Sequence, residues 1–315
     1  MINDFKIWFN RKNKMIFSVI LGIIALILIL QFLNNKAKKE NDTEQIQNNV
    51  NETKISESVS LNDSNTVLTG DKISDTQKTT LNKISEFIKY CNEKDIEKAY
   101  DMLSDNCKNQ LYPEKSVFEE AYYKKVFNGK TRRANIENWV DNIYKVSIED
   151  DYLSTGKYTR GNGIQDYITI VGDKININEY IGKKEIKKSN ENDNIKIEIE
   201  EVNKFMEYEI YKLKVTNKSK YTILLDDRKD VDAMYIKDQN DVEYHAYTHE
   251  ITDSELTLDP RQTKEIEIKY YNKYGSDKEI EEMVFSRMIL DNDAYQIYDD
   301  KTQYKYYSEF HIEIK

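Results

Sequence analysis

The two cysteines of the chain, Cys91 and Cys107, carry its most distinctive side-chain chemistry, and fifteen residues separate them. This spacing is not that of a CxxC redox pair, and no neighbouring histidines complete a metal-binding set. In an exported protein a disulfide closing this loop would stabilise the fold by roughly 3 kcal/mol. Cys91 also continues the apolar face of an expected helix, where it would pack as a small buried hydrophobe. A disulfide and a pair of buried thiols therefore both remain open.

The three histidines, His245, His249 and His311, all lie in the last quarter of the chain. His245 and His249 are expected on one strand, where residues four apart share a face but are about 13 Å from each other. That distance is too long for one metal ion. The acidic run at 291–300 lacks the order of an EF-hand loop. We therefore expect no metal site and no cofactor.

General acid–base catalysis would need a positioned and suitably tuned side chain. The stretch from residue 70 to 185 contains carboxylates, among them Asp141 and Asp166, but no histidine. A carboxylate base without such a partner is weak support for an enzyme, so we expect no catalytic residue.

Tyrosines crowd the end of the chain. Tyrosine is enriched in protein interfaces as well as on exposed strands. We interpret this group as a binding face. Its members are Tyr295, Tyr298, Tyr304, Tyr306 and Tyr307.

The charge of the chain is unevenly distributed. The first 39 residues carry seven basic and one acidic side chain, whereas the whole chain has a net charge of −10. The remainder is therefore strongly acidic and would repel phosphate backbones. Nucleic acid is not an expected partner.

An uncharged apolar run of 19 residues, 15–33, is long enough to cross a bilayer as a helix. No small-residue cleavage site follows it, which favours an uncleaved anchor over a signal peptide. The basic residues before it favour a cytoplasmic tail, 1–14, with the rest of the chain outside the cell membrane. Residues 34–74 contain no aromatic side chain and are expected to form a flexible stalk.

Residues 75–182 begin with helical periodicity and then change to the alternation of strands. Three helices are expected: one near 74–91, one capped by Asp95, and one that follows Pro113 and ends at Gly129. The strands are expected near 132–140, 144–153, 164–172 and 174–181, with a turn at Gly172 and Asp173. This order indicates an α+β cone, with helices packed on a curved antiparallel sheet.

The stretch "FIKYCNEKDIEKAYDMLSDNCKNQL" resembles the opening helices of nuclear transport factor two-like domains, and "VGDKININEYI" is similar to their last strands. That fold includes enzymes, ligand binders and scaffolds, so the resemblance implies a fold and no single function.

A polar, charged run at 183–194 is interpreted as a linker. Residues 195–315 then show many short strands separated by turn signals, the pattern of an all-β sandwich. The segments "YKLKVTNKSKYTILL" and "LDPRQTKEIEIKY" resemble bacterial extracytoplasmic immunoglobulin-like domains, without the Cys…Trp…Cys core of antibodies.

The composition, rich in Lys, Asn, Ile, Asp and Glu with only 9 glycines and 2 prolines, resembles that of proteins from Gram-positive bacteria of low GC content. Together these features predict a non-catalytic, single-pass envelope protein that binds a protein partner. One version is a component of a secretion or conjugation-type complex, because the layout of tail, span and cone resembles the assembly component of type IV secretion systems. A ligand-sensing ectodomain with a small molecule or peptide in the cone is the alternative. A hydrolase or isomerase is the weakest hypothesis, and the oligomeric state is left open.

Overall fold

The computed structural model describes residues 59–60, 66–68, 75–150, 163–227, 233–275 and 277–315. The chain divides into two units, Met1–Ser56 and Glu57–Lys315, and all described residues belong to the second. The predicted tail and anchor, 1–33, therefore lie outside the described residues. Among the helices that are described, none combines the length and apolar character needed to span a membrane.

The helices form where the sequence predicts them, with one addition. Asp95 and Ser104 cap the second and third helices by accepting from the amides of Lys98 and Cys107. The extra helix, α4, begins at this serine cap. Beyond Pro113 one continuous helical run includes a π-helical turn, and Gly129 with φ 67° follows it. The elements are α2 (Asp75–Asn92), α3 (Ile96–Asp101), α4 (Asp105–Leu111), α5 (Lys115–Phe118), η1 (Glu119–Tyr123) and α6 (Lys124–Val126).

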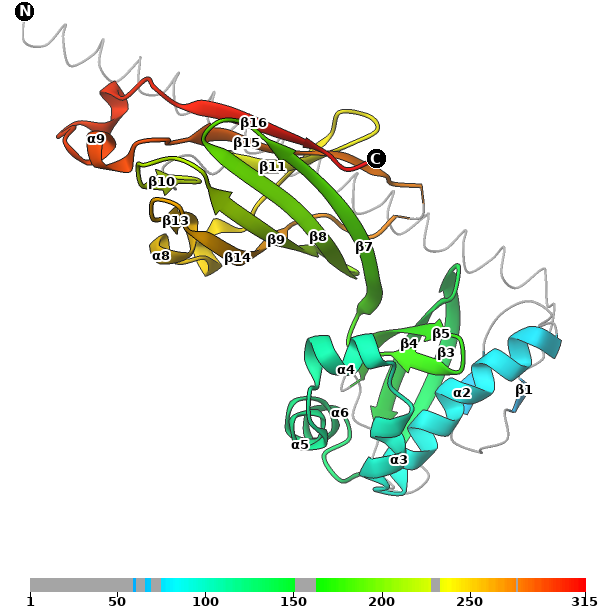
Figure 1. Cartoon of the computed structure of the whole chain (residues 1–315). Coiled ribbons are helices and arrows are strands. Elements are labelled where there is room, and N and C mark those ends of the chain that lie inside the picture. Colours follow the sequence, from blue (N-terminus) through cyan, green and yellow to red (C-terminus); the bar gives the residue numbers. More distant parts are fainter. Residues whose placement is uncertain (1–58, 61–65, 69–74, 151–162, 228–232, 276) are drawn as a thin grey trace, which may run out of the picture. The chain divides into compact units, whose positions relative to one another are not determined.

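The helices accompany a six-stranded sheet in the order β1-β2-β3-β4-β5-β6, whose first two strands precede them in the chain (Figure 1). Its strands pair antiparallel except for β2 and β3, which are parallel. Val171 pairs with Lys174 around the predicted turn, where Gly172 has φ 61°. The strands are β1 (Val59–Ser60), β2 (Thr66–Leu68), β3 (Arg132–Val140), β4 (Ile143–Asp150), β5 (Ile164–Val171) and β6 (Lys174–Asn176).

Strands β1 and β2 correct the prediction of a flexible stalk over 34–74. The stalk prediction rested on the lack of large apolar side chains, but main-chain hydrogen bonds to β3 require no particular side chain. The parallel pairing runs from Thr66 beside Ala134 to Leu68 beside Ile136. Folded structure therefore begins before residue 75.

The linker prediction for 183–194 is wrong for most of its length. Strand β7 (Tyr180–Glu191) passes through it and pairs with β8 (Ile195–Phe205), leaving only residues 192–194 as a turn. A strand at the edge of a sheet is commonly rich in lysine, which discourages pairing with other chains. The "KKEIKK" run thus marks an edge strand, although its polarity is also that of a linker.

Two antiparallel four-stranded sheets make up the rest of the fold, in the orders β14-β9-β8-β7 and β12-β11-β15-β16. A short ladder of β10 (Ile223–Leu224) and β13 (Thr257–Leu258) accompanies them. The remaining strands are β9 (Glu209–Asn217), β11 (Met234–Asp238), β12 (Glu243–His245), β14 (Thr263–Tyr270), β15 (Ile280–Met288) and β16 (Ser308–Glu313). The short helical segments are η2 (Thr248–Glu250), α8 (Asp253–Leu256), α9 (Asn292–Gln296) and η3 (Lys301–Gln303).

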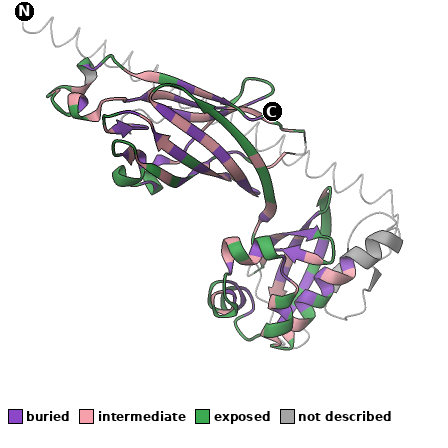
Figure 2. Ribbon diagram, in the orientation of Figure 1, coloured by how far each residue is buried: buried purple, intermediate pink, exposed green. Residues whose placement is uncertain are grey.

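Two cores hold these elements together, and buried residues alternate with exposed ones along the strands (Figure 2). In one core Phe87 and Phe118 pack with Tyr122 between the helices and the six-stranded sheet. In the other, apolar residues of both four-stranded sheets, such as Ile197 and Phe285, face one another. The prediction of helices with a mostly antiparallel sheet, followed by an all-β part built of antiparallel sheets, is confirmed at this level.

Candidate functional site

Both cysteines are buried inside the helical part, Cys91 in α2 and Cys107 in α4. They are free thiols, so the structure contains no Cys91–Cys107 bond and has the second of the two arrangements that the sequence left open. Burial raises the pKa of the Cys91 thiol well above its usual value and raises the pKa of Cys107 to about 12. Because the thiolate is the reactive form, neither thiol is poised for chemistry near neutral pH.

Asp166 on β5 is a buried carboxylate with a structural task. It accepts the Tyr122 hydroxyl at 2.7 Å and the backbone amides of Asn178 and Glu179 at 3.1 and 3.0 Å. Both of the latter residues have left-handed backbones, with φ of 58° and 63°. Burial raises the pKa of Asp166, although these hydrogen bonds act in the opposite direction. The carboxylate therefore fixes the turn that leads from β6 into β7.

Asp141, the other acidic residue considered for catalysis, is exposed in the turn between β3 and β4. It accepts a long hydrogen bond of 3.3 Å from Tyr274. The structure thus places Asp141 and Asp166 in quite different environments, one in solvent and one enclosed by donors.

The histidines do not share one strand. His245 is the last residue of β12, His249 belongs to the 3-10 turn η2, and His311 lies on β16. The chain turns between the first two, so the expected common face of His245 and His249 is not formed. His311 contacts Glu282 through Nδ1 at 2.8 Å and Glu309 through Nε2 at 3.1 Å. No group of three or more metal-ligating side chains occurs among the residues that the structure describes.

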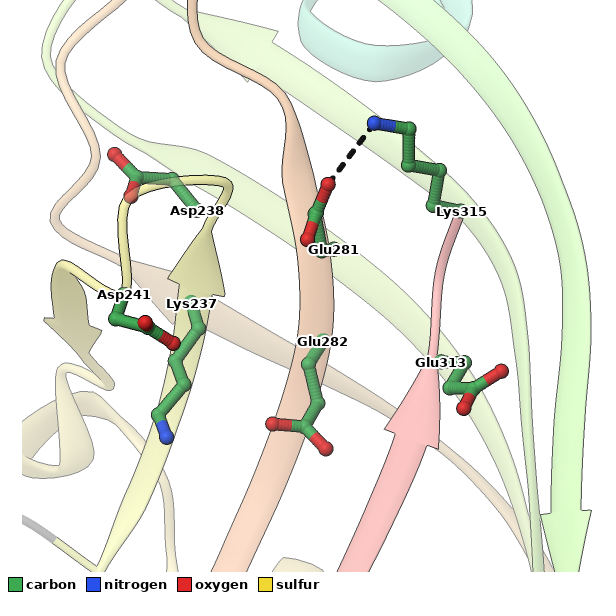
Figure 3. A pocket seen from close by; sticks show the side chains of 7 residues that line it. All are labelled: Lys237, Asp238, Asp241, Glu281, Glu282, Glu313 and Lys315. Carbon is green, nitrogen blue, oxygen red and sulfur yellow. Dashed lines mark hydrogen bonds and ion pairs between the residues drawn. The ribbon is translucent and has the colours of Figure 1, made fainter.

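An acidic pocket of about 270 Å³ lies beside strands β11, β15 and β16 (Figure 3). Three of its carboxylates, those of Asp238, Glu281 and Glu282, contact other groups of the protein. Asp238 accepts the amides of Asn240 and Val242 and the Tyr244 hydroxyl, at 2.8, 3.1 and 2.9 Å. Burial acts to raise the pKa of Asp238, but these three donors outweigh it and lower the pKa. The residues lining the pocket are Lys237, Asp238, Asp241, Glu281, Glu282, Glu313 and Lys315.

The other charges of this pocket are at least partly exposed, and several of them are paired. Lys315 contacts Glu281 at 2.9 Å and Glu279 at 3.1 Å, and Glu282 contacts His311. Exposed pairs of this kind contribute little stability, typically about 0–1 kcal/mol. The arrangement resembles a solvated end of a sheet more than a built ligand site.

The tyrosines predicted as a binding face are mostly packed against one another. The ring of Tyr304 is only 6 % exposed, and its centroid lies 4.9 to 5.7 Å from the other four rings. Tyr295 and Tyr307 both donate to Oδ2 of Asp227, at 3.0 and 3.1 Å. Only Tyr306, at 72 %, is widely exposed. Mutual packing accounts for this burial, because edge-to-face contacts between tyrosine rings cover much of their apolar area. The binding face stays a prediction.

A different aromatic group, which the sequence did not reveal, is on the surface. We call it the Lys269 cluster, and it consists of Lys269, Tyr208, Tyr247, Tyr271 and His249. Lys269 Nζ lies 4.3 Å from the ring centroid of Tyr208 and 5.5 Å from that of Tyr247. The Tyr247 ring is 5.0 Å from Tyr271 and 5.7 Å from His249. These residues come from three separate segments of the chain.

Strand pairing brings those segments together. Lys269 points outward from β14, because Ile268 and Tyr270 on either side of it are buried. An isolated bridge between Ala246 and Tyr270 holds residue 247 beside the end of β14, and the Tyr247 amide donates to the Lys269 carbonyl at 2.7 Å. No sequence signal short of the strand register could have predicted this contact.

Comparisons with family models, curated proteins and solved structures gave no match for this chain. Inference of function therefore depends on the side chains themselves.

Proposed function

We propose that the chain is a non-catalytic, membrane-anchored binding protein whose folded parts lie outside the cell membrane. The apolar run at 15–33 supports the anchor, and the acidic body after it suits export. We further propose that the helical part has the nuclear transport factor two-like fold and that the two-sheet part is immunoglobulin-like. Helices packed on a six-stranded sheet, followed by two four-stranded sheets around one core, support both assignments.

The Lys269 cluster is the observation that supports a binding role. Tyr271 is 52 % exposed, and Tyr208 and Tyr247 are half-buried, so their rings are held in place while part of each remains open to solvent. Pre-ordered aromatic side chains lose little conformational entropy when a partner covers them. Tyrosine is also among the residues most often found at the centres of interfaces.

This surface suits a protein partner whose binding surface is bordered by basic residues. Such a partner would belong to an envelope assembly such as a secretion or conjugation-type complex. Lys269 is already neutralised by Glu250, whose Oε2 lies 3.4 Å from Nζ. The wider body is acidic, so it should accelerate association with basic surfaces and make the rate sensitive to salt. Aromatic contacts would then set the lifetime of the complex.

In-cell crosslinking of the full-length protein tests this proposal. The double variant Tyr247→Ala, Tyr271→Ala should lose capture of the partner, because truncating central interface aromatics commonly costs about 1–3 kcal/mol each. The variant Tyr221→Ala removes another exposed tyrosine, 42 % accessible, that contacts only Lys220 among the aromatic and cationic groups described, and is the matched control. Equal capture by all three proteins would refute a role for the cluster.

The anchor is tested separately by membrane fractionation. Full-length protein should remain in the membrane pellet after carbonate washing and dissolve in detergent. A soluble product that starts after residue 33 would mean that the apolar run is removed and is not an anchor.

A further inference from the structure

A second exposed aromatic group lies on the outer face of the six-stranded sheet. We call it the Trp139 platform, and it consists of Glu137 and Trp139 on β3, Lys145 on β4, and Gln165 and Tyr167 on β5. Trp139 is 51 % exposed, and its ring centroid lies 5.8 Å from that of Tyr167. Lys145 Nζ is 5.8 Å from the Trp139 ring.

The register of the strands explains why these side chains share one face. Glu137 pairs with Lys145, and Lys145 pairs with Tyr167, so the three form one row across the sheet. Alternate residues of a strand point to the same side, which adds Gln165 to that face. Trp139 lies where the register between β3 and β4 shifts, and its contacts with Tyr167 and Lys145 place it on the same face. The opposite face carries Ile136, Val146 and Ile168, which are buried in the core.

The platform has little net charge although the body of the protein is acidic. It contains one acidic and one basic side chain, together with a neutral amide and the Tyr167 hydroxyl. Gln165 donates through Nε2 to that hydroxyl at 3.1 Å, which holds the amide beside the aromatic pair. The two large rings stand at 69° to each other, so one ring face is bordered by the edge of the other and by neutral hydrogen-bonding groups. Such a surface suits an uncharged ligand that has both an apolar face and many hydroxyls.

A neutral glycan has this chemistry. The C–H groups on one face of a pyranose ring pack on the electron-rich face of an aromatic ring. Its hydroxyls can pair with amide, carboxylate and ammonium groups at the margin of the same surface. The Trp139 and Tyr167 rings are 5.8 Å apart, and residues two apart on a strand, such as Tyr167 and Gln165, are separated by about 7 Å. The three side chains together therefore cover up to about 13 Å, enough for a disaccharide.

We propose that the Trp139 platform binds a neutral glycan chain. This site is additional to the proposed protein-binding role and does not depend on the Lys269 cluster. If the chain is exported as proposed, the glycan strands of the envelope lie within its reach.

Binding of three tetrasaccharides to the full-length protein tests the proposal, in a detergent without a sugar headgroup. The probes are neutral tetramers of N-acetylglucosamine and of glucose, and an anionic tetramer of galacturonic acid. The chain has two tryptophans, Trp8 and Trp139, so a Trp8→Phe background makes Trp139 the reporter. We expect saturable quenching by at least one neutral tetramer and weaker binding of the anionic one.

Calorimetry with variants completes the test. Trp139→Ala should weaken binding of the neutral tetramer by about tenfold or more, and Trp139→Phe by less, because a smaller ring remains. Gln165→Ala should weaken binding a few fold, and Tyr306→Ala, which removes an exposed tyrosine outside the platform, should not change it. Absence of saturable binding by either neutral tetramer, unchanged affinity in Trp139→Ala, or preference for the anionic tetramer would overturn the proposal. Loss of glycan binding would leave the crosslinking result of the Lys269 cluster unaffected.

Discussion

Replacing Asp166 should strongly destabilise the helical part of the fold. The side chain is 4 % exposed and serves three donors, two of them amides of consecutive residues in left-handed conformation. Left-handed backbone is unfavourable for residues other than glycine and persists only where other contacts hold it. Asp166 supplies those contacts.

The size of the effect follows from the donors left behind. A buried donor without a partner costs about 1–3 kcal/mol, and Asp166→Ala creates three such donors. Relief of the desolvation penalty of a buried charge offsets part of this cost. We therefore expect a net loss of about 3–5 kcal/mol for Asp166→Ala. Asp166→Asn keeps the volume and one acceptor but turns an N–H towards an amide, and should cost about 2–3 kcal/mol.

Urea denaturation of protein comprising the second unit, Glu57–Lys315, measures these losses. Asp141→Asn is the matched control, because Asp141 is exposed and its φ of 49° is one that asparagine accommodates readily. The control should change stability by less than about 0.5 kcal/mol. Equal losses for Asp166→Ala and Asp141→Asn would refute the idea that the buried carboxylate holds the turn.

The pH dependence gives an independent check on Asp166. Burial raises its pKa in the folded protein above the value of about 3.9 in the unfolded chain. Between these two values the folded state binds more protons, so this group stabilises the fold increasingly as the pH falls through that window. The difference in unfolding free energy between wild type and Asp166→Asn should therefore widen as the pH is lowered. A difference that narrows would mean that the pKa is lowered by folding.

Three further predictions concern the cysteines, the tyrosine group and the predicted linker. Cys91 and Cys107 should not react with a thiol reagent at pH 8 in the folded protein, and both should titrate after denaturation without reductant; fewer than two thiols would indicate a disulfide. Tyr304→Ala should lower the free energy of unfolding by about 3–4 kcal/mol and Tyr306→Ala by less than about 0.5, as measured by denaturation; similar losses would contradict the packing described. Limited proteolysis should leave 183–191 uncut, since strand pairing protects it, whereas early cleavage there would restore the linker interpretation.

Periodicity in the sequence predicted most strands and helices, because an element that buries one face has apolar residues at regular intervals along the chain. The alternation of Ile195, Ile197 and Ile199 is an example, since all three are buried in the core between the two sheets. The same reasoning failed for β7, whose residues are mostly exposed on an edge. Strand β7 is held by main-chain pairing with β8, and such pairing requires no hydrophobic pattern in the sequence.

The candidate sites were harder to predict, because exposure depends on contacts between distant segments. Tyr304 and Tyr306 are two residues apart, yet one is 6 % and the other 72 % exposed. Residue type alone predicts the same exposure for both side chains. Tyr208, Tyr247 and Tyr271 have no common sequence pattern, and only the bridge from Ala246 to Tyr270 makes two of them neighbours. Predicting such a group requires the register of strands that are far apart in the chain.

Where the reactive side chains lie suggests how this fold divides its residues between structure and recognition. Asp166 and the two cysteines have side chains that could take part in acid–base or thiol chemistry. All three are buried and contribute to the packing of the helical part. The aromatic residues left on the surface are held by neighbours, as Trp139 is by Tyr167 and Tyr247 is by Lys269. Side chains that are both exposed and pre-ordered lower the entropic cost of binding, whereas a catalytic group needs access and a tuned pKa. This arrangement is consistent with the binding role that we propose for the protein.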